Sequence, residues 1–204
     1  HGHHRRQRQM CIRDSLTPMY SLSNAFNNED IFNFLKQIRS FLDLSESENI
    51  DLVFEPKIDG LSLSLIYKNG ILFQALTRGD GHIGEDVTEN ARLIRDVPIS
   101  IPIKIDTLEI RGEVYFPNST FSELNEELEK SGGKTFSNPR NAASGTLRQF
   151  KSNKNRNKNL CFFAYSVGNA THQLADSQAM LLKVFNDIGF KTNDISKVFT
   201  SVEE

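Results

Sequence analysis

The chain of 204 residues contains no apolar run near the roughly 18 residues that a membrane-spanning helix needs. It also has no apolar h-region near its start, so nothing marks it for secretion. Cysteine is scarce: Cys11 and Cys161 are too few to hold zinc without other ligands, and their spacing indicates no disulfide framework. With 38% hydrophobic and 25% charged residues, the composition is that of an ordinary globular protein. We therefore expect a cytoplasmic protein with no membrane segment.

Residues 1–15, HGHHRRQRQMCIRDS, differ from the rest because they carry four arginines and three histidines with no apolar period. A basic arm for nucleic acid is one interpretation. We favour the other, a foreign leader such as a tag or a translated sequencing-adapter remnant. Four Arg and one Asp give this segment a charge of +3, which leaves −5 for residues 16–204 against −2 for the whole chain. An acidic body argues against general nucleic-acid binding, so any DNA contact must come from a local patch.

Apolar periodicity predicts an α+β fold around an antiparallel sheet. Alternation with period two predicts five strands, over residues 51–56, 61–67, 71–77, 107–116 and 160–167. The first three are expected to be successive antiparallel neighbours, with Asn69-Gly70 as a hairpin turn. Helical spacing predicts four helices. The first is capped at Asn27 or Asn28 and reaches Leu42, and the second covers residues 88–95. The third begins with a Thr120–Glu123 capping box and ends at Gly132-Gly133, and the fourth runs from Leu174 to Ile188.

The segment Glu55-Pro56-Lys57-Ile58-Asp59-Gly60 comes where a strand is expected to end. In an extended run Glu55, Lys57 and Asp59 share one face, and a lysine there could act as a nucleophile. An ordinary lysine keeps its proton at pH 7, and removing it costs about 4–5 kcal/mol, so a metal, other cations or desolvation would have to help. The four-residue Lys-x-Asp-Gly pattern alone is weak, and taken by itself it favours an ordinary surface Lys–Asp salt bridge over a nucleophile.

A second motif, Thr77-Arg78-Gly79-Asp80-Gly81-His82-Ile83-Gly84-Glu85-Asp86, is rich in glycine. Glycines let backbone approach a ligand closely, and the planar guanidinium of Arg78 suits phosphate or carboxylate. The alternative is a solvent-exposed loop.

A third motif, Glu109-Ile110-Arg111-Gly112-Glu113-Val114, lies in an expected strand. The pleat puts its three charged residues on the face opposite the apolar ones, and such a row is commonly the solvent side of a strand. Gly112, between two charges, indicates that another group packs closely over it.

A fourth segment, residues 134–159, carries seven positive and no negative charges. Arg140 and Arg148 lie among small residues that would allow phosphates to approach, so both are candidates for phosphate contact. The lysine-rich end is interpreted as a solvated loop with weak, salt-sensitive attraction to DNA.

Five blocks in this order, over residues 18–26, 55–60, 77–90, 111–114 and 138–149, together resemble the bacterial NAD-dependent DNA ligases. The first, third and last blocks are specific to this family, whereas Lys-x-Asp-Gly alone also suits ATP-dependent ligases and RNA-capping enzymes. The resemblance covers residues 16–204. It implies a nucleotidyltransferase core with an antiparallel sheet, like the ATP-grasp-like adenylation core of DNA ligases, truncated at both ends.

The resemblance implies three transfers. Lys57 would attack the adenylyl phosphorus of NAD, releasing nicotinamide mononucleotide (NMN) and leaving AMP on the lysine. The AMP would then pass to the 5′-phosphate of a nick in double-stranded DNA, and the 3′-hydroxyl would displace it. Mg²⁺ would supply the offsetting positive charge, and no residue is assigned as its ligand.

The family's cofactor positions fall on Ser21, Leu22, Glu55, Arg78 and Glu113. Of these, the resemblance puts Ser21 and Leu22 on the adenine side, Arg78 at ribose or phosphate, and Glu113 at the ribose hydroxyls. Asp59 would orient Lys57. Arg140 and Arg148 match positions that assist phosphate or nicked-DNA contact.

The family also has a small N-terminal helical domain that captures the nicotinamide half and a downstream Asp-Gly-Val-Val-x-Lys strand, and the chain shows neither. We therefore expect a monomeric fragment that folds around its central sheet but does not seal nicks. Two other hypotheses stay open: a related nucleotidyltransferase with another donor such as ATP, and an inactive DNA-binding module that uses residues 134–159.

Overall fold

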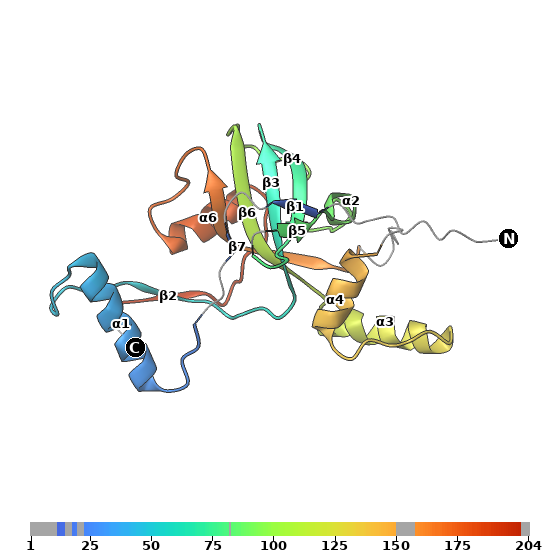
Figure 1. Ribbon diagram of the computed structural model, residues 1–204, viewed down its shortest axis with the longest axis horizontal. Coiled ribbons are helices and arrows are strands. Elements are labelled where there is room, and N and C mark those ends of the chain that lie inside the picture. The colour runs from blue at the N-terminus through green and yellow to red at the C-terminus, as the bar shows by residue number, and fades with distance from the viewer. Residues whose placement is uncertain (1–11, 15–17, 20–22, 82, 150–157, 201–204) are drawn as a thin grey trace. The chain divides into compact units, whose positions relative to one another are not determined.

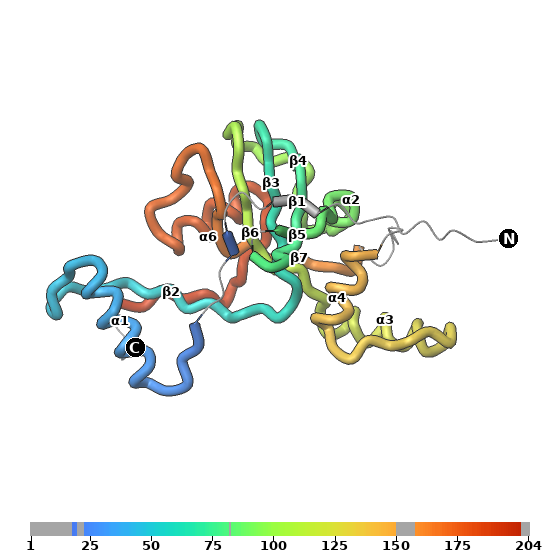
Figure 2. The backbone as a smooth tube through the Cα atoms, in the orientation of Figure 1, coloured from blue at the N-terminus to red at the C-terminus, as the bar shows by residue number. Residues whose placement is uncertain are grey.

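The computed structural model describes residues 12–14, 18–19, 23–81, 83–149 and 158–200 (Figure 1). The chain divides into two compact units. The first contains His1–Met19 and Pro56–Asp194, and the second contains Tyr20–Glu55 and Ile195–Glu204. Figure 2 traces the backbone through both units.

The first unit is built on a four-stranded antiparallel sheet in the order β4-β3-β6-β7 (Figure 1). Its strands are β3 Leu61–Lys68, β4 Ile71–Thr77, β6 Thr107–Tyr115 and β7 Cys161–Ala170. Asn69 and Gly70 join β3 to β4 with φ angles of 50° and 78°, the left-handed geometry that a two-residue hairpin needs. The predicted α+β architecture and the predicted hairpin are therefore confirmed.

One face of this sheet carries the apolar core. Leu63, Leu65 and Tyr67 of β3 are fully buried there. Helix α6, Gln178–Asp187, packs against β7, and the ring of Phe190 beyond it lies 5.9 Å from that of Tyr67 and 6.0 Å from that of Phe162. A Cβ at Gly112 would overlap the Phe162 ring, so the close packing expected at this glycine is confirmed.

Two helices follow β6. Helix α3, Asn118–Lys130, begins before the predicted capping box, and Thr120 Oγ1 donates to Pro117 O at 3.2 Å. The capping-box prediction was wrong because the helix has already started at Thr120. The end is as predicted: Gly132 has a φ of 69°, and Gly133 N donates to Leu128 O at 2.7 Å.

Helix α4, Pro139–Leu147, was not predicted, although the sequence carries a start signal for it. The side chain of Asn138 accepts from Asn141 N at 2.7 Å, and Pro139 occupies the first turn, where its missing N–H costs nothing.

Smaller differences concern the remaining boundaries. Helix α2 covers only Thr88–Ala91, because turns follow that bring Ile94 and Val97 into the core. Helix α6 starts at Gln178, where Ser177 Oγ accepts from Met180 N at 3.3 Å. Strand β1, Ile12–Asp14, falls inside the segment interpreted as a leader and pairs antiparallel with β5, Ile83–Glu85.

The second unit contains α1, Asn28–Leu42, and a two-stranded sheet of β2, Leu52–Phe54, with β8, Lys197–Phe199. Asn27 caps α1, as predicted, by accepting from Asp30 N at 2.9 Å. The expectation that residues 51–56 pair with 61–67 was wrong: the strand ends at Phe54 and pairs with β8. Pro56 offers no N–H to a ladder, which favours a break there.

Among the described helices, none combines the length and the apolar character needed to cross a membrane.

Candidate active site

Lys57 lies on the exposed segment that leads into β3. Residues 55–59 belong to no strand. Glu55 belongs to the second unit, where it follows β2, whereas Lys57 and Asp59 belong to the first. Ser21 and Leu22 lie outside the described residues.

Gly60 holds this segment against β6. A Cβ at Gly60 would overlap the Val114 carbonyl and lie 3.1 Å from Glu113 Cγ. With no Cβ in the way, Gly60 N donates to Glu113 Oε1 at 3.2 Å. Ser62 Oγ, two residues further, donates to Glu113 Oε2 at 2.9 Å. The glycine of the Lys-x-Asp-Gly motif therefore binds the segment that carries Lys57 to the carboxylate of Glu113.

Glu113 is a buried carboxylate that faces positive charges. Burial raises its pKa, and the hydrogen bond from Ser62, the charge of Lys57, the hydrogen bond from Gly60 and the charge of Arg140 oppose that rise. An ionised carboxylate can accept about four hydrogen bonds, and two donors from the described part of the chain contact this one. Glu113 therefore has capacity to accept from the hydroxyl groups of a ligand.

Arg140 joins α4 to the segment of Lys57. Its Nη1 lies 2.9 Å from Asp59 Oδ1, and both side chains are more than half exposed. The structure thus brings together three residues that the sequence singled out separately: Asp59, Glu113 and Arg140.

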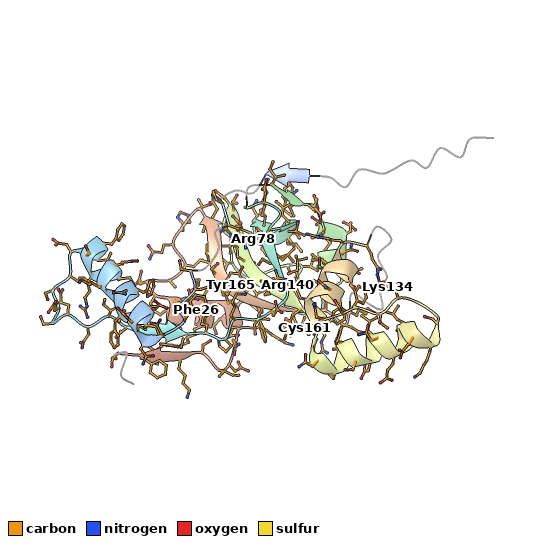
Figure 3. All side chains as sticks on the ribbon, turned by 60° about the horizontal axis from the view of Figure 1, so that its bottom comes forward. Phe26, Arg78, Lys134, Arg140, Cys161 and Tyr165 are labelled. Carbon is orange, nitrogen blue, oxygen red and sulfur yellow. The ribbon has the colours of Figure 1, made fainter. Side chains whose placement is uncertain are left out.

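Tyr165 and Arg78 belong to the same neighbourhood (Figure 3). Burial raises the pKa of Tyr165; a hydrogen bond with Ser62 lowers it, the charge of Glu113 raises it, and the charges of Arg111 and Arg78 lower it. Tyr165 was missed at the sequence level. It lies where the β6–β7 register shifts between Arg111 and Gly112, so its place beside Ser62 depends on a bulge.

Glu109 and Arg111 form an ion pair on the same sheet face. Glu109 is fully buried, and its Oε1 accepts from Ser64 Oγ at 2.7 Å and from Arg111 Nε at 2.9 Å. The interpretation of this row as a solvent face was therefore wrong for Glu109 and for Glu113, which is also buried.

The 77–90 motif holds the far end of α4. Arg148 Nε lies 2.6 Å from Glu85 Oε2. Asn90 Nδ2 donates to Leu147 O at 2.7 Å and to Gln149 O at 2.9 Å. Arg148 is thus paired with this loop, whereas Arg140, at the start of α4, is paired with Asp59. The lysine-rich segment 150–157 lies outside the described residues.

An exposed amine, a buried carboxylate and nearby guanidinium groups form a chemically coherent site. Guanidinium groups bind phosphate, a carboxylate accepts from hydroxyls, and an amine can attack an electrophile once it loses its proton. Among the described residues, no group of three or more His, Cys, Asp or Glu side chains could hold a metal ion.

Comparison with known proteins agrees with this chemistry. The family model of the NAD-dependent DNA ligase adenylation domain matches residues 11–204. The chain is 48% identical over 187 residues to a DNA ligase of Rickettsia bellii, covering 92% of this chain and 27% of that protein. It is 47% identical over 186 residues to a DNA ligase of Roseobacter denitrificans, covering 91% of this chain and 26% of that one.

Fold and site together define an α+β protein with a charged sheet face suited to a phosphorylated ligand. The chain belongs to the NAD-dependent DNA ligase adenylation domain family. It spans about a quarter of the length of the DNA ligases that it matches.

Proposed function

We propose that this chain is the adenylate-accepting core of an NAD-dependent DNA ligase, with Lys57 as the residue that takes AMP. The unshared electron pair of Lys57 Nζ attacks the adenylyl phosphorus of NAD after the ammonium proton has left. A nitrogen–phosphorus bond forms while the bond between this phosphorus and the oxygen of the NMN phosphate breaks. The AMP then moves to the 5′-phosphate of a DNA nick, and the 3′-hydroxyl displaces it.

The observation that carries the proposal is the attachment of the Lys57 segment to Glu113. Gly60 N and Ser62 Oγ both donate to this carboxylate, and the charge of Lys57 acts on it. A ribose bound at Glu113 through its hydroxyls would therefore lie near the nucleophile. Correct placement of reacting groups is a large part of catalysis of this kind.

The remaining roles follow the resemblance. Ser21 and Leu22 are proposed for the adenine side, Glu55 for the cofactor, and Arg78 for ribose or phosphate. Asp59 is proposed to orient Lys57, with Arg140 as its observed partner. Arg140 and Arg148 are also proposed to contact phosphate or nicked DNA. Each printed ion pair uses one nitrogen of its guanidinium, so a phosphate would bind through the remaining N–H donors or replace the carboxylate.

Mg²⁺ belongs to the proposal as the source of positive charge on the phosphates. This ion is commonly held by one or two carboxylates together with substrate phosphates. The described residues hold no group of three or more His, Cys, Asp or Glu side chains that could bind an ion by themselves. None of the steps assigned to the chain's residues depends on it.

Labelling tests the donor and the acceptor. The chain is incubated with NAD or with ATP labelled at the adenylyl phosphorus, alongside Lys57→Ala, Lys57→Arg and the control Lys130→Ala. Lys130 is exposed on α3, so its variant is expected to take label as the wild type does. We expect label from NAD on the wild type and on Lys130→Ala, and none on either Lys57 variant.

Three outcomes contradict the proposal. Label taken from ATP in place of NAD favours a related nucleotidyltransferase, which family membership disfavours. Label that survives Lys57→Ala removes Lys57 as the acceptor. A chain that takes no label from either donor but binds DNA in a salt-dependent way is the inactive DNA-binding module.

Nicked double-stranded DNA is the proposed macromolecular partner, and the chain is proposed to act as a cytoplasmic monomer. The partial nucleotidyltransferase domain is proposed to begin at residue 16, with residues 1–15 as a foreign leader. The family match from residue 11 and the strand at Ile12–Asp14 overlap the end of that leader.

A further inference from the structure

The hydroxyl of Ser62 is held at a definite place beside Glu113. Ser62 is the direct partner of Glu113 in the β3–β6 ladder, so the two side chains project from the same face of the sheet at neighbouring positions. Ser62 Oγ donates to Glu113 Oε2 at 2.9 Å, and Gly60 N donates to Glu113 Oε1 at 3.2 Å. A hydrogen bond with Tyr165 of β7 also holds the Ser62 hydroxyl. Each oxygen of the carboxylate therefore has its own donor, and the chain fixes both donors.

The strand on the other side of Glu113 offers no comparable donor. Glu113 is paired in the β6–β7 ladder with Phe163, whose phenyl ring has no N–H or O–H group. Of these two cross-strand neighbours, Ser62 is thus the one that can donate to the carboxylate. Burial raises the pKa of Glu113, and the hydrogen bond from Ser62 opposes that rise more than the charges of Lys57 and Arg140 do. Ser62 therefore contributes both to the orientation and to the ionisation of this carboxylate.

A carboxylate held in this way suits a pair of adjacent hydroxyls. Each oxygen of an ionised carboxylate has about two acceptor positions, and the donors from Gly60 and Ser62 use one on each oxygen. A second position on each oxygen can then accept from a ligand, and the two neighbouring hydroxyls of a ribose supply two such donors. Without the Ser62 hydroxyl, Gly60 would hold one oxygen alone and the carboxylate could turn about its Cγ–Cδ bond. The loss would therefore be felt by a ligand that uses both oxygens.

We propose that Ser62 is a positioning residue that holds the carboxylate of Glu113 for the two hydroxyls of the adenosine ribose, and thereby gives the site a preference for ribose over deoxyribose nucleotides. The inference rests on the proposed function, which assigns Glu113 to the ribose hydroxyls. Ser62 acts through Glu113 and makes no contact of its own with the nucleotide.

The probes are AMP and 2′,3′-dideoxy-AMP, which share base and phosphate and differ in the two ribose hydroxyls. Isothermal titration calorimetry measures their affinities, so the test needs no transfer to Lys57. We expect the wild type to bind AMP at least about tenfold more tightly than dideoxy-AMP, a difference of about 1.4 kcal/mol. In Ser62→Ala we expect AMP to bind about tenfold more weakly and dideoxy-AMP to stay within about twofold of its wild-type affinity, so that most of the preference is lost.

Two further variants separate positioning from a purely structural role. Ser62→Thr keeps the hydroxyl and is expected to keep the preference for AMP. Ser64→Ala is the matched control, because Ser64 lies on the same strand and its Oγ donates to another buried carboxylate, that of Glu109, at 2.7 Å. Glu109 has no proposed contact with the nucleotide, so this variant is expected to bind both probes as the wild type does. Circular dichroism checks that each variant folds, and Ser62→Cys, with a weak thiol donor, replaces Ser62→Ala if that variant does not.

A folded Ser62→Ala that keeps the wild-type preference overturns the proposal, and so does one that binds both probes more weakly to the same extent. Loss of the preference in Ser62→Thr or in Ser64→Ala also overturns it, because the hydroxyl beside Glu113 would then not be the cause. A wild type that binds AMP and dideoxy-AMP equally refutes the assignment of Glu113 to the ribose, and with it this inference. A wild type that prefers AMP yet takes no label from NAD refutes AMP transfer alone and leaves the role of Ser62 intact.

Discussion

Replacing Gly60 by alanine tests the link between Lys57 and the sheet. The added methyl overlaps the carbonyl oxygen and carbon of Val114, which are backbone atoms of the central strand β6. Leu61 is paired with Val114 in the β3–β6 ladder, so neither side can move without loosening that ladder. The segment of residues 57–60 is the part expected to move, and Gly60 N then loses Glu113 as its acceptor.

The size of the effect follows from two contributions. Forcing an extra carbon into a packed site costs about 1–3 kcal/mol. Losing a hydrogen bond to a charged acceptor costs about 1.5–3 kcal/mol. Movement of residues 57–60 breaks the hydrogen bond but relieves part of the overlap, so the two costs do not add fully. We therefore expect a loss of about 2–5 kcal/mol in the free energy of unfolding. For a chain of this size that lowers the midpoint of thermal unfolding by about 5–20 °C.

Calorimetry and urea unfolding measure the stability change, and labelled NAD measures AMP transfer in the same preparations. Gly133→Ala is the matched control, because its new methyl would lie 3.3 Å from Leu128 Cδ2 and from Leu128 O, a tight contact without the overlap found at Gly60, and we expect it to lie within about 1 kcal/mol of the wild type. A Gly60→Ala chain as stable as the wild type, transferring AMP at the wild-type rate, would refute the assigned packing of Gly60 against Val114.

Three further changes have definite expected outcomes. Glu113→Gln should abolish AMP transfer. Because burial raises the pKa of Glu113, its ionisation destabilises the folded wild type as pH rises, so the stability of the variant relative to the wild type should increase from about pH 4 to about pH 7. Urea titrations at both pH values check the sign. Asp59→Asn breaks an exposed ion pair with Arg140, so it should change the free energy of unfolding by less than about 1 kcal/mol. It should also slow adenylation, and a variant that is adenylated at the wild-type rate contradicts the role of Asp59. Asn90→Ala removes two hydrogen bonds at the end of α4 and should cost about 1–3 kcal/mol in thermal unfolding, with KM for NAD unchanged.

The parts of the fold that depend on local chemistry were predictable. Asn69-Gly70 predicts its hairpin because both residues tolerate positive φ, and the alternation of Leu61–Tyr67 predicts the strand β3. The alternation did not predict that Ser64 and Ile66, on the other face of β3, are buried too. Helix α4 was equally local: Asn138-Pro139 is a cap followed by a first-turn proline, and the small residues after it obscured the signal.

The contacts that define the site were not predictable in the same way. Arg140 and Asp59 are 81 residues apart, and only the packing of α4 brings them together. Tyr165 reaches Ser62 through a register shift that no periodicity in the sequence encodes. The burial of Glu109 depends on β7 being the neighbour of β6 in the sheet, with Gly168 of β7 next to the carboxylate.

Helix α4 connects the motif at residues 77–90 with the segment that carries Lys57. Its first turn places Arg140 beside Asp59, while its last residues are held by Glu85 and Asn90 of the glycine-rich motif. The helix thus spans from the loop after β4 to the segment of Lys57, and each end is fixed by a charged or amide side chain. A change in the loop that shifts α4 would therefore alter the environment of Asp59 without touching it. For this reason substitutions at Glu85 or Asn90 should be judged by the rate of AMP transfer as well as by stability.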